Sequence, residues 1–334
     1  MKDKQEIEEV IMNEYDYELM LFDRIEKIKQ INSEYDLLNN SYISFSGGKD
    51  STVLHYLIDF ALPNNNIPRV FLNTGIEHQA IIEFVKELAA TDKRIIIVNS
   101  GVNIKQMLEK EGYPFKSKEH SSKVNRYQRG SRSASVMSYK DGNNFNCPKF
   151  NCPKILQYQF NSDFKLKVSS NCCNRLKKEP IKRWQKANNK PITLTGMRRD
   201  EGGQRANIGC LSTDSSGKLK MFHPLLVVND DFEKEFIKLN NIKLCKLYYP
   251  PYNFERTGCK GCPFALQLQK QLDVMERLLP AEKKQCEILW APVYEEYRRI
   301  GYRLRPKGVY KQTCIFDYLE EENNGKITYK ENTI

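Results

Sequence analysis

The sequence predicts an α/β fold in which a parallel sheet carries helices on both faces, with helical segments before and after it. Short apolar runs alternate with stretches of helical periodicity between residues 42 and 98, and this alternation is typical of parallel sheets with right-handed crossovers. The first apolar run also leads into a glycine-rich turn and then a helix, the usual arrangement of an anion-binding loop.

The elements follow from local pattern. Residues 1 to about 40 have apolar side chains at roughly helical spacing among charged ones, which predicts a helical segment. Strands are predicted at residues 42–45, 69–72, 94–98 and 191–196, with an extended segment at 222–226. Helices are predicted at residues 52–58, 77–89, 232–240, 267–279 and 281–299.

These elements divide the chain into a helical segment (1–40), an α/β domain that contains the glycine-rich turn (41–230) and a mainly helical C-terminal region (231–334). An insertion at about 112–167 breaks the periodicity of the α/β domain. It is rich in serine and in basic residues, namely Lys116, Lys118, Lys123, Arg126, Arg129, Arg132 and Lys140. We expect either a solvated loop or a mobile basic flap over a phosphate-bearing substrate or a nucleic-acid backbone.

Composition narrows the class of protein. The 334 residues carry a formal net charge of +11, which indicates a polyanionic partner. No apolar run approaches the ~20 residues of a membrane helix, so no membrane association is expected. The charged N-terminus lacks the apolar core of a signal peptide, which predicts a cytoplasmic protein. Ten cysteines in that compartment indicate reduced, metal-bound or catalytic thiols rather than disulfides.

The turn after the first strand has the chemistry of a phosphate site. It consists of Ser46, Gly47, Gly48, Lys49, Asp50 and Ser51. Adjacent glycines bring backbone N–H groups close to a ligand, and the positive end of the following helix favours an anion. The kinase-type loop is excluded, because Ile43 stands where its first glycine belongs and Asp50 follows Lys49. A glycine turn that binds nothing is the alternative.

The cysteines include a vicinal pair, Cys172 and Cys173, and a Cys-Lys-Gly-Cys segment, Cys259 to Cys262. Thiolates suit an iron–sulfur cluster or zinc, although adjacent cysteines fit a four-cysteine zinc site poorly. Unliganded buried thiols are the alternative. Cys147 and Cys152 are rival ligands, a second metal site or loop thiols, with loop thiols favoured. Cys210 is a candidate substitute for one member of the vicinal pair.

Residues 46–51 resemble the pyrophosphate loop of the adenine nucleotide alpha-hydrolase superfamily. The four cysteines are similar to the [4Fe–4S] signature of assimilatory APS reductases. Residues 196–201 with Arg205 resemble that family's Gly-x-Arg-x-x-Glu…Arg segment, and Asn73-Thr74-Gly75 resembles its turn after the second strand. These motifs occur in the family's order from residue 41 to about 265, so the chain resembles the PAPS/APS reductase family.

The resemblance implies a nucleotide site and a [4Fe–4S] cluster. It places the phosphates of ATP or a sulfonucleotide on residues 46–51, with Asn73, Thr74, Gly75 and Gly196 around the same site. Lys49 and Mg²⁺ would neutralise the leaving pyrophosphate, and Asp50 is either a magnesium contact or a helix cap. Arg198 and Arg205 would bind phosphate oxygens, and Glu201 would orient one of them. The cluster ligands would be Cys172, Cys173, Cys259 and Cys262.

One departure from the family bears on function. Sulfonucleotide reductases are similar to one another in a tail cysteine within Glu-Cys-Gly-Leu/Ile-His, whereas Cys314 lacks the glycine and histidine and has acidic neighbours, which disfavour a thiolate. We therefore expect ATP-dependent sulfur insertion into nucleic acid, resembling DNA phosphorothioation or tRNA thiolation, with a sulfur-donor or reductant protein as partner. The alternatives are a PAPS or APS reductase that releases sulfite and a non-catalytic nucleotide- and cluster-binding sensor.

Overall fold

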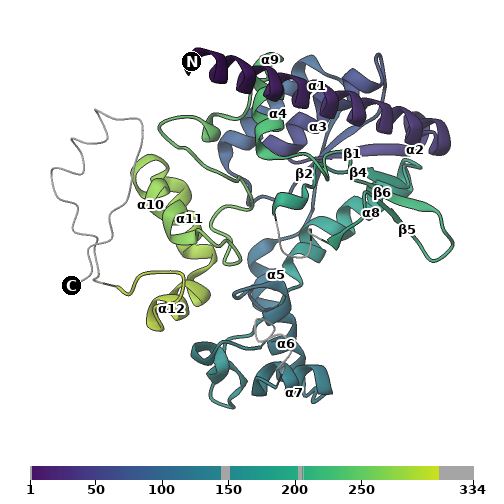
Figure 1. The fold of residues 1–334 in the computed structure, drawn as a ribbon. Helices are drawn as coiled ribbons and strands as arrows, with labels where there is room; N and C mark the ends of the chain where they lie inside the picture. Colours follow the sequence, from purple (N-terminus) through teal and green to yellow (C-terminus); the bar gives the residue numbers. More distant parts are fainter. Residues whose placement is uncertain (1, 144–150, 202–204, 206, 308–334) are drawn as a thin grey trace.

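The computed structural model describes residues 2–143, 151–201, 205 and 207–307 of the 334-residue chain, with side chains from residue 16 onward except at Glu201 (Figure 1). Its sheet has six strands in the order β3-β2-β1-β4-β6-β5. The strands are β1 (Ser41–Phe45), β2 (Arg69–Asn73), β3 (Ile95–Asn99), β4 (Ile192–Leu194), β5 (Leu211–Thr213) and β6 (Leu219–Phe222). All neighbours pair in parallel except β5 and β6. The predicted α/β class is confirmed, with one antiparallel edge strand added.

Twelve α-helices are assigned within the described residues. They are α1 (Lys2–Tyr35), α2 (Leu37–Asn40), α3 (Lys49–Ala61), α4 (Gln79–Thr91), α5 (Ile104–Glu111), α6 (Lys118–Gln128), α7 (Ala134–Asp141), α8 (Glu179–Ala187), α9 (Asp230–Leu239), α10 (Leu268–Leu278), α11 (Pro280–Leu289) and α12 (Ala291–Arg299). In the described part of the chain, no helix combines the length and apolar character needed to cross a bilayer.

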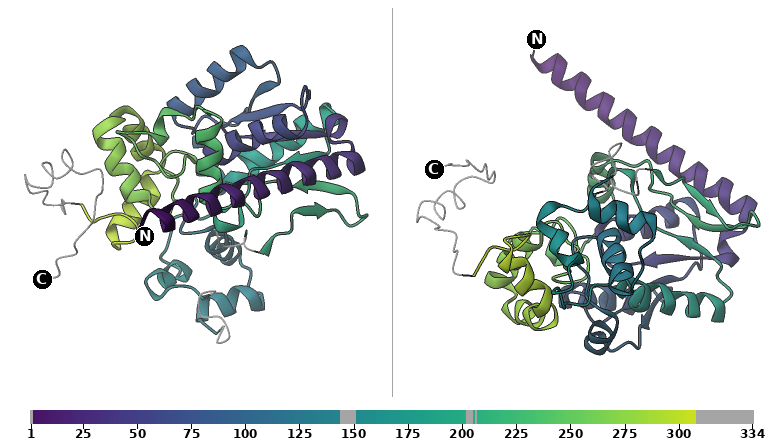
Figure 2. Two further views of the ribbon diagram at one scale, coloured as in Figure 1. Left: turned by 45° about the horizontal axis from the view of Figure 1, so that its top comes forward. Right: turned by 90° about the horizontal axis from the view of Figure 1, so that it is seen from below.

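Side chains alternate along β1, which places helices on both faces of the sheet. Tyr42 packs on Trp184 of α8, with ring centroids 5.2 Å apart. Phe45 points to the other face, where its ring lies 6.1 Å from His55 of α3. Helix α1 packs against α3 and α9 on that second face (Figures 1 and 2). The sheet is therefore the middle layer of a three-layer arrangement, as parallel sheets require.

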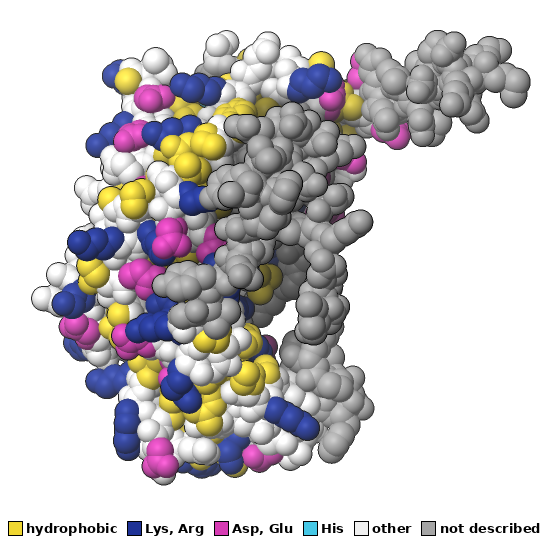
Figure 3. Space-filling view, turned by 90° about the vertical axis from the view of Figure 1, so that its left-hand side faces the viewer, with side chains coloured by type: hydrophobic (Ala, Val, Ile, Leu, Met, Phe, Trp, Pro, Cys, Tyr) yellow, Lys and Arg dark blue, Asp and Glu magenta, His cyan; other side chains and the backbone are white. Residues whose placement is uncertain are grey.

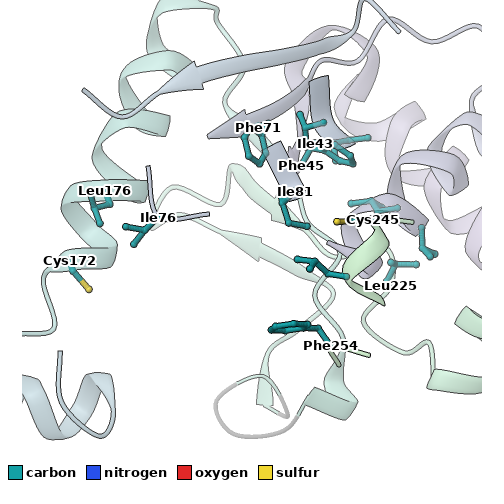
Figure 4. Packing of buried hydrophobic residues seen from close by; sticks show 14 of the residues in the cluster. Ile43, Phe45, Phe71, Ile76, Ile81, Cys172, Leu176, Leu225, Cys245 and Phe254 are labelled. Carbon is teal, nitrogen blue, oxygen red and sulfur yellow. The ribbon is translucent and has the colours of Figure 1, made fainter. Parts of the chain in front are cut away.

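The hydrophobic core joins segments that are far apart in the sequence. Figure 4 shows Phe45 and Phe71 from neighbouring strands converging with Ile81 of α4. Phe254, from the C-terminal region, is also buried in this core. The C-terminal region thus packs directly on the α/β domain, although the division into three parts stays a prediction. On the surface shown in Figure 3, positive and negative side chains are interspersed over the described residues.

Two expectations about local structure are wrong. The insertion is not a solvated loop, because α6, α7 and a 3₁₀-helix (Lys154–Phe160) bury Val124, Val136 and Leu156, and Val124 and Leu156 belong to the main hydrophobic core. Its apolar residues lie on separate short elements, so no single stretch shows their periodicity. The predicted helix at 281–299 is two helices that meet at Trp290, because Pro292 in the first turn of α12 has no N–H to continue α11.

Candidate functional site

The predicted phosphate loop lies between β1 and α3, at the carboxyl edge of the sheet. Strand β1 ends at Phe45 and α3 begins at Lys49. Gly47 has φ +68°, and a Cβ there would lie 2.8 Å from Cγ2 of Val85 in α4. The turn therefore requires glycine on both conformational and steric grounds. The N-cap residue of α3, Gly48, has no side chain to cap the helix, so the first turn of α3 faces the loop without a capping group from its own N-cap residue.

Two serine hydroxyls hold this turn closed. Ser46 N donates to Ser51 Oγ at 3.1 Å, and the two hydroxyl oxygens lie 2.9 Å apart. Ser51 Oγ also donates to the Gly48 carbonyl at 2.9 Å. Ser51 is buried and Ser46 is exposed. Ser51 thus has a structural role, whereas Ser46 can contact a ligand.

The end of β4 packs directly on the start of α3 at Gly196. A Cβ on Gly196 would lie 2.6 Å from the Asp50 carbonyl oxygen and 3.1 Å from Ser51 N. Both contacts are with backbone, which cannot rotate away. The glycine expected from the Gly-x-Arg motif therefore lets the segment after β4 approach the first turn of α3.

A network of charges surrounds Lys49 at the mouth of the loop. Lys49 Nζ lies 2.6 Å from Glu233 Oε2 and 3.8 Å from Asp230 Oδ1. Arg198 donates from Nε to Asp50 at 3.2 Å and from Nη2 to Asp230 at 2.6 Å. The structure thus brings together three predicted site residues from two distant segments, with two carboxylates of α9 between their cations.

Three buried atoms of this network have no hydrogen-bond partner among the described residues, namely Nη1 of Arg198 and both carboxylate oxygens of Glu233, of which Oε2 has its ion contact with Lys49. Glu233 is fully buried. Burial and the nearby Asp50 raise its pKa to about 7, against the lowering effect of Lys49. Unsatisfied buried donors and acceptors are costly. Arg198 therefore has a donor in place for an incoming anion, and Glu233 has an acceptor in place for an incoming cation.

Sequence reasoning missed Glu233 and Asp230. A signal was present, because Glu233 falls between Phe232 and Phe236 on the buried face of α9. An acidic side chain on an apolar helix face requires a buried cation or hydrogen-bond donor. Here the cations are Lys49 and Arg198.

Arg205 and Glu201 are the other predicted members of this segment. Arg205 is half-buried; burial lowers its pKa and Asp50 raises it, so the guanidinium lies within electrostatic reach of the loop. The backbone of Glu201 ends a 3₁₀-helix (Arg199–Glu201). Its side chain is outside the described residues, so its expected orienting role stays a prediction.

The Asn73-Thr74-Gly75 turn follows β2 at the same edge of the sheet, and Glu77 organises it. Glu77 accepts hydrogen bonds from Thr74 N at 2.9 Å, Thr74 Oγ1 at 2.6 Å and Gly75 N at 3.1 Å. Asn73 Oδ1 also accepts from Gly75 N, at 3.1 Å. These groups are therefore occupied within the turn, and sequence reasoning did not identify Glu77.

Two hydroxyl groups from the C-terminal region cover the phosphate loop. Tyr248 OH accepts from Lys49 N at 2.9 Å and lies 2.6 Å from Thr257 Oγ1. A Cβ on Gly48 would lie 3.2 Å from that tyrosine oxygen. The first amide of α3 therefore already has a hydroxyl partner, at the position where a phosphate oxygen would bind.

The four predicted cluster cysteines influence one another. Cys172 and Cys173 begin a helix that is interrupted by a π-turn (Asn174–Lys178), a distortion frequent at functional sites. The hydrogen bond with Cys173, burial, and Cys262 and Cys259 raise the pKa of Cys172. Figure 4 shows Cys172 and Leu176 on one helical segment, on the side where Ile76 lies.

Positive charge also reaches this group. The hydrogen bond from Cys172 lowers the pKa of Cys173, and Lys118, Lys177 and Lys178 lower it further. Lys177 also has its pKa raised, first by Cys259. Nearby ammonium groups favour thiolates, which are the form that binds iron.

Within the described residues, no set of three or more Cys, His, Asp or Glu side chains is already arranged around a metal position. The four thiols nevertheless shift one another's pKa, as the pKa of Cys262 shows: burial and Cys259 raise it to about 12, and Cys173 adds to this. Four soft donors in one neighbourhood, beside lysines, fit an iron–sulfur cluster in donor type and charge.

The rival cysteines have other surroundings. Cys152 is buried in the insertion near Lys116, and burial raises its pKa to about 12. Cys210 Sγ lies 3.5 Å from the His223 carbonyl and near Arg24 of α1. These neighbours do not support either residue as a replacement ligand. Cys147 and Cys314 lie outside the described residues.

A family model described as the phosphoadenosine phosphosulfate reductase domain matches residues 40–141 and 149–265, about two thirds of the chain. An uncharacterized protein of Methanocaldococcus jannaschii is 26% identical over 258 residues, covering 74% of this chain. The chain spans 49% of the length of that relative. The match to the family model begins just before the predicted phosphate loop and ends just after the second cysteine pair.

Solved structures with some likeness to this fold include three enzymes. A PAPS reductase of Candida auris is 17% identical, with 66% of this chain and 81% of that chain covered and a TM-score of 0.37. An FMN adenylyltransferase of Candida glabrata is 15% identical, with 73% of this chain and 62% of that chain covered and a TM-score of 0.44. A U34-tRNA thiolase of Methanococcus maripaludis, determined with its [4Fe–4S] cluster, is 16% identical, with 95% of this chain and 92% of that chain covered and a TM-score of 0.38. At these TM-scores the likenesses carry no conclusion about activity.

Proposed function

The chain belongs to the phosphoadenosine phosphosulfate reductase domain family, and on that premise we propose that it is an enzyme that activates an acceptor with ATP for sulfur transfer. The proposed acceptor is a nucleic acid, in keeping with the net charge of +11. The adenine nucleotide would occupy the phosphate loop, and the sulfur chemistry would take place at the four cysteines.

One observation carries this proposal: a single short segment contacts both places. Tyr248 and Thr257 lie over the phosphate loop. Cys259 follows two residues after Thr257, and the Lys260 backbone donates to the Ile76 carbonyl beside the turn after β2, at 2.8 Å. A nucleotide in the loop and the thiols would therefore be neighbours of the same stretch of backbone.

In the nucleotide complex, the first turn of α3 would bind the β- and γ-phosphates. Lys49 would exchange its contact with Glu233 for a phosphate oxygen and neutralise the departing pyrophosphate. Arg198 would donate from Nη1, which has no partner among the described residues. Mg²⁺ fits the carboxylates at this edge, of which Asp50 belongs to the loop itself.

The residues that would hold an iron–sulfur cluster are Cys172, Cys173, Cys259 and Cys262. Bound there, a [4Fe–4S] cluster supplies iron that can carry or polarise sulfur. The chain's own residues would position it, with Lys177 near Cys259 offsetting thiolate charge.

The activation step proposed for ATP is an attack by an acceptor oxygen on the α-phosphorus. A new bond from that oxygen to phosphorus forms while the bond to the pyrophosphate oxygen breaks, and pyrophosphate leaves with the electron pair. A sulfur-donor protein would then deliver sulfide, which displaces the activated oxygen together with AMP. No net oxidation or reduction is needed when the donor supplies sulfur as sulfide.

The family match favours a second candidate, reduction of PAPS or APS with release of sulfite. That reaction needs a nucleophilic thiol and a reductant protein. Cys314, the thiol considered for this role, lies outside the described residues. A non-catalytic sensor remains the third alternative.

Pyrophosphate release decides among these functions. Protein purified without oxygen is incubated with ATP and Mg²⁺, with and without bulk RNA or DNA, and pyrophosphate is measured. The proposal expects release that nucleic acid stimulates and that Lys49→Met abolishes. Sulfite formed from PAPS or APS, and lost in Cys314→Ser, would establish the reductase. Nucleotide binding without either product would leave the sensor.

A further inference from the structure

We propose that the helical insertion, described at residues 112–143 and 151–167, binds the phosphodiester backbone of a nucleic acid and presents it to the four-cysteine site. The binding surface is argued from the insertion alone. Its connection to sulfur transfer rests on the proposed function.

The insertion concentrates the positive charge of the chain. Its described residues include ten Lys or Arg and three Asp or Glu, a net charge of +7 against +11 for the whole protein. The remaining residues are therefore close to balanced in sign. A local excess of this size attracts a polyanion rather than a single phosphate.

Much of this charge has no carboxylate beside it. Among the described residues, no Asp or Glu oxygen lies within 4.0 Å of the cationic nitrogens of Arg126, Arg129 or Arg132, which are all exposed. Arg126 donates to Ser133 Oγ at 2.9 Å instead. Arg132 donates to the Tyr127 carbonyl at 3.0 Å and lies 3.7 Å from the centre of that tyrosine ring.

Several arginines elsewhere in the protein are paired with carboxylates, whereas Arg183 and Arg303 contact backbone carbonyls instead. Arg94 contacts Asp59 at 2.7 Å, and Arg298 contacts Glu287 at 2.6 Å. Arg126, Arg129 and Arg132 have no described carboxylate that would compete with a phosphate, and their guanidinium groups match phosphate oxygens in geometry.

The insertion is a folded platform for these arginines. His120 is buried at its centre, with Nδ1 2.9 Å from Tyr139 OH and Nε2 2.8 Å from Gln159 Oε1. The rings of Tyr127 and Phe160 pack edge to face at 5.1 Å. The basic surface is therefore held in place before a ligand binds, which lowers the entropy cost of binding.

The base of the insertion is fixed to the cysteine site. Lys116 N donates to Tyr297 OH at 2.7 Å, and that hydroxyl donates to the Pro263 carbonyl at 2.9 Å, one residue after Cys262. Helices α6 and α7 project from the body of the molecule on the side away from α1 (Figures 1 and 2). A strand bound along them would lead toward the thiols.

The test is direct binding without ATP. Fluorescence anisotropy is measured with one labelled sequence prepared as single-stranded RNA, single-stranded DNA and duplex DNA, over a range of salt concentrations. The variant Arg126→Gln/Arg129→Gln/Arg132→Gln is compared with the wild type. The control, Lys29→Gln/Lys238→Gln/Lys243→Gln, removes three exposed cations that are each paired with a glutamate.

The insertion variant is expected to bind about tenfold or more weakly at moderate salt, with the salt slope reduced by about 2 to 3, whereas the control binds as the wild type does. The three probes identify which nucleic acid binds best. Equal losses in both variants, or none in either, would overturn the proposal. The single variant Arg129→Glu tests whether lost binding reflects misfolding. It should bind nucleic acid more weakly while its thermal unfolding transition stays as in the wild type. ATP binding is measured in the same insertion variant. If the variant still binds ATP, the outcome for nucleic-acid binding can be judged independently of the proposed function.

Discussion

Replacing Gly196 by alanine tests whether the phosphate loop depends on the end of β4. The added methyl would lie 2.6 Å from the Asp50 carbonyl oxygen, whereas ordinary contacts begin near 3.4 Å, so the two backbones must separate by about 0.8 Å. Strain of this kind costs about 1–3 kcal/mol in a packed site. The first turn of α3 would move with it, and a displacement near 1 Å in a binding site costs up to about 100-fold.

The assay measures ATP affinity by titration calorimetry and stability by urea unfolding at the same pH. Gly196→Ala should bind ATP at least about tenfold more weakly, a loss of about 1.4 kcal/mol. The matched control is Gly258→Ala, because that position is exposed, has no positive φ and would place a Cβ with nothing within 4 Å. Wild-type ATP affinity and stability in Gly196→Ala would refute this account of the loop.

Two further substitutions probe the groups around Lys49. The pKa of Glu233 is raised from 4.5 to about 7 in the folded state. The free energy of unfolding of the wild type should therefore decrease as the pH rises from 4.5 to about 7, by about 3 kcal/mol in total. Glu233→Gln should remove this fall in urea unfolding while Glu235→Gln keeps it, and parallel profiles for all three proteins would contradict the prediction. Tyr248→Phe should free the Lys49 amide for phosphate and tighten ATP binding by up to about tenfold, since one hydrogen bond contributes about 1 kcal/mol. Tyr249→Phe is its control, and weaker binding in Tyr248→Phe would mean that the hydroxyl itself contacts the nucleotide.

The sequence predicts the α/β framework because its signals are local. The loop at residues 46–51 follows β1 directly, and the glycines, the lysine and the helix start are contiguous. The predicted strand at 69–72 corresponds to β2 (Arg69–Asn73). Parallel topology then brings Gly196 and the turn after β2 to the same edge, because all these strands point the same way.

Contacts made only by tertiary packing escape that reasoning. Glu233 meets Lys49 across 184 residues of chain, and Tyr248 meets it across 199. Neither residue belongs to a motif, and a tyrosine hydroxyl on a helix amide has no sequence pattern. The sequence did not predict the helices of the insertion for a related reason, since its buried apolar residues lie on three short elements.

The four-cysteine site could be predicted only in part from the sequence. Their spacing indicates a shared site, but only the fold shows that the helix after Cys172 and the turn around Cys259 lie together. The pKa of each thiol in these two pairs is affected by at least one of the others.

The measurement that most directly tests whether nucleotide and thiols share one site is electron paramagnetic resonance of protein purified without oxygen and reduced, recorded with and without a non-hydrolysable ATP analogue. We predict an iron–sulfur signal that changes when the analogue binds, that is lost in Cys259→Ser, and that no longer responds to the analogue in Gly196→Ala. Protein that contains no iron, or a signal that the analogue leaves unchanged while calorimetry shows it bound, would contradict the account.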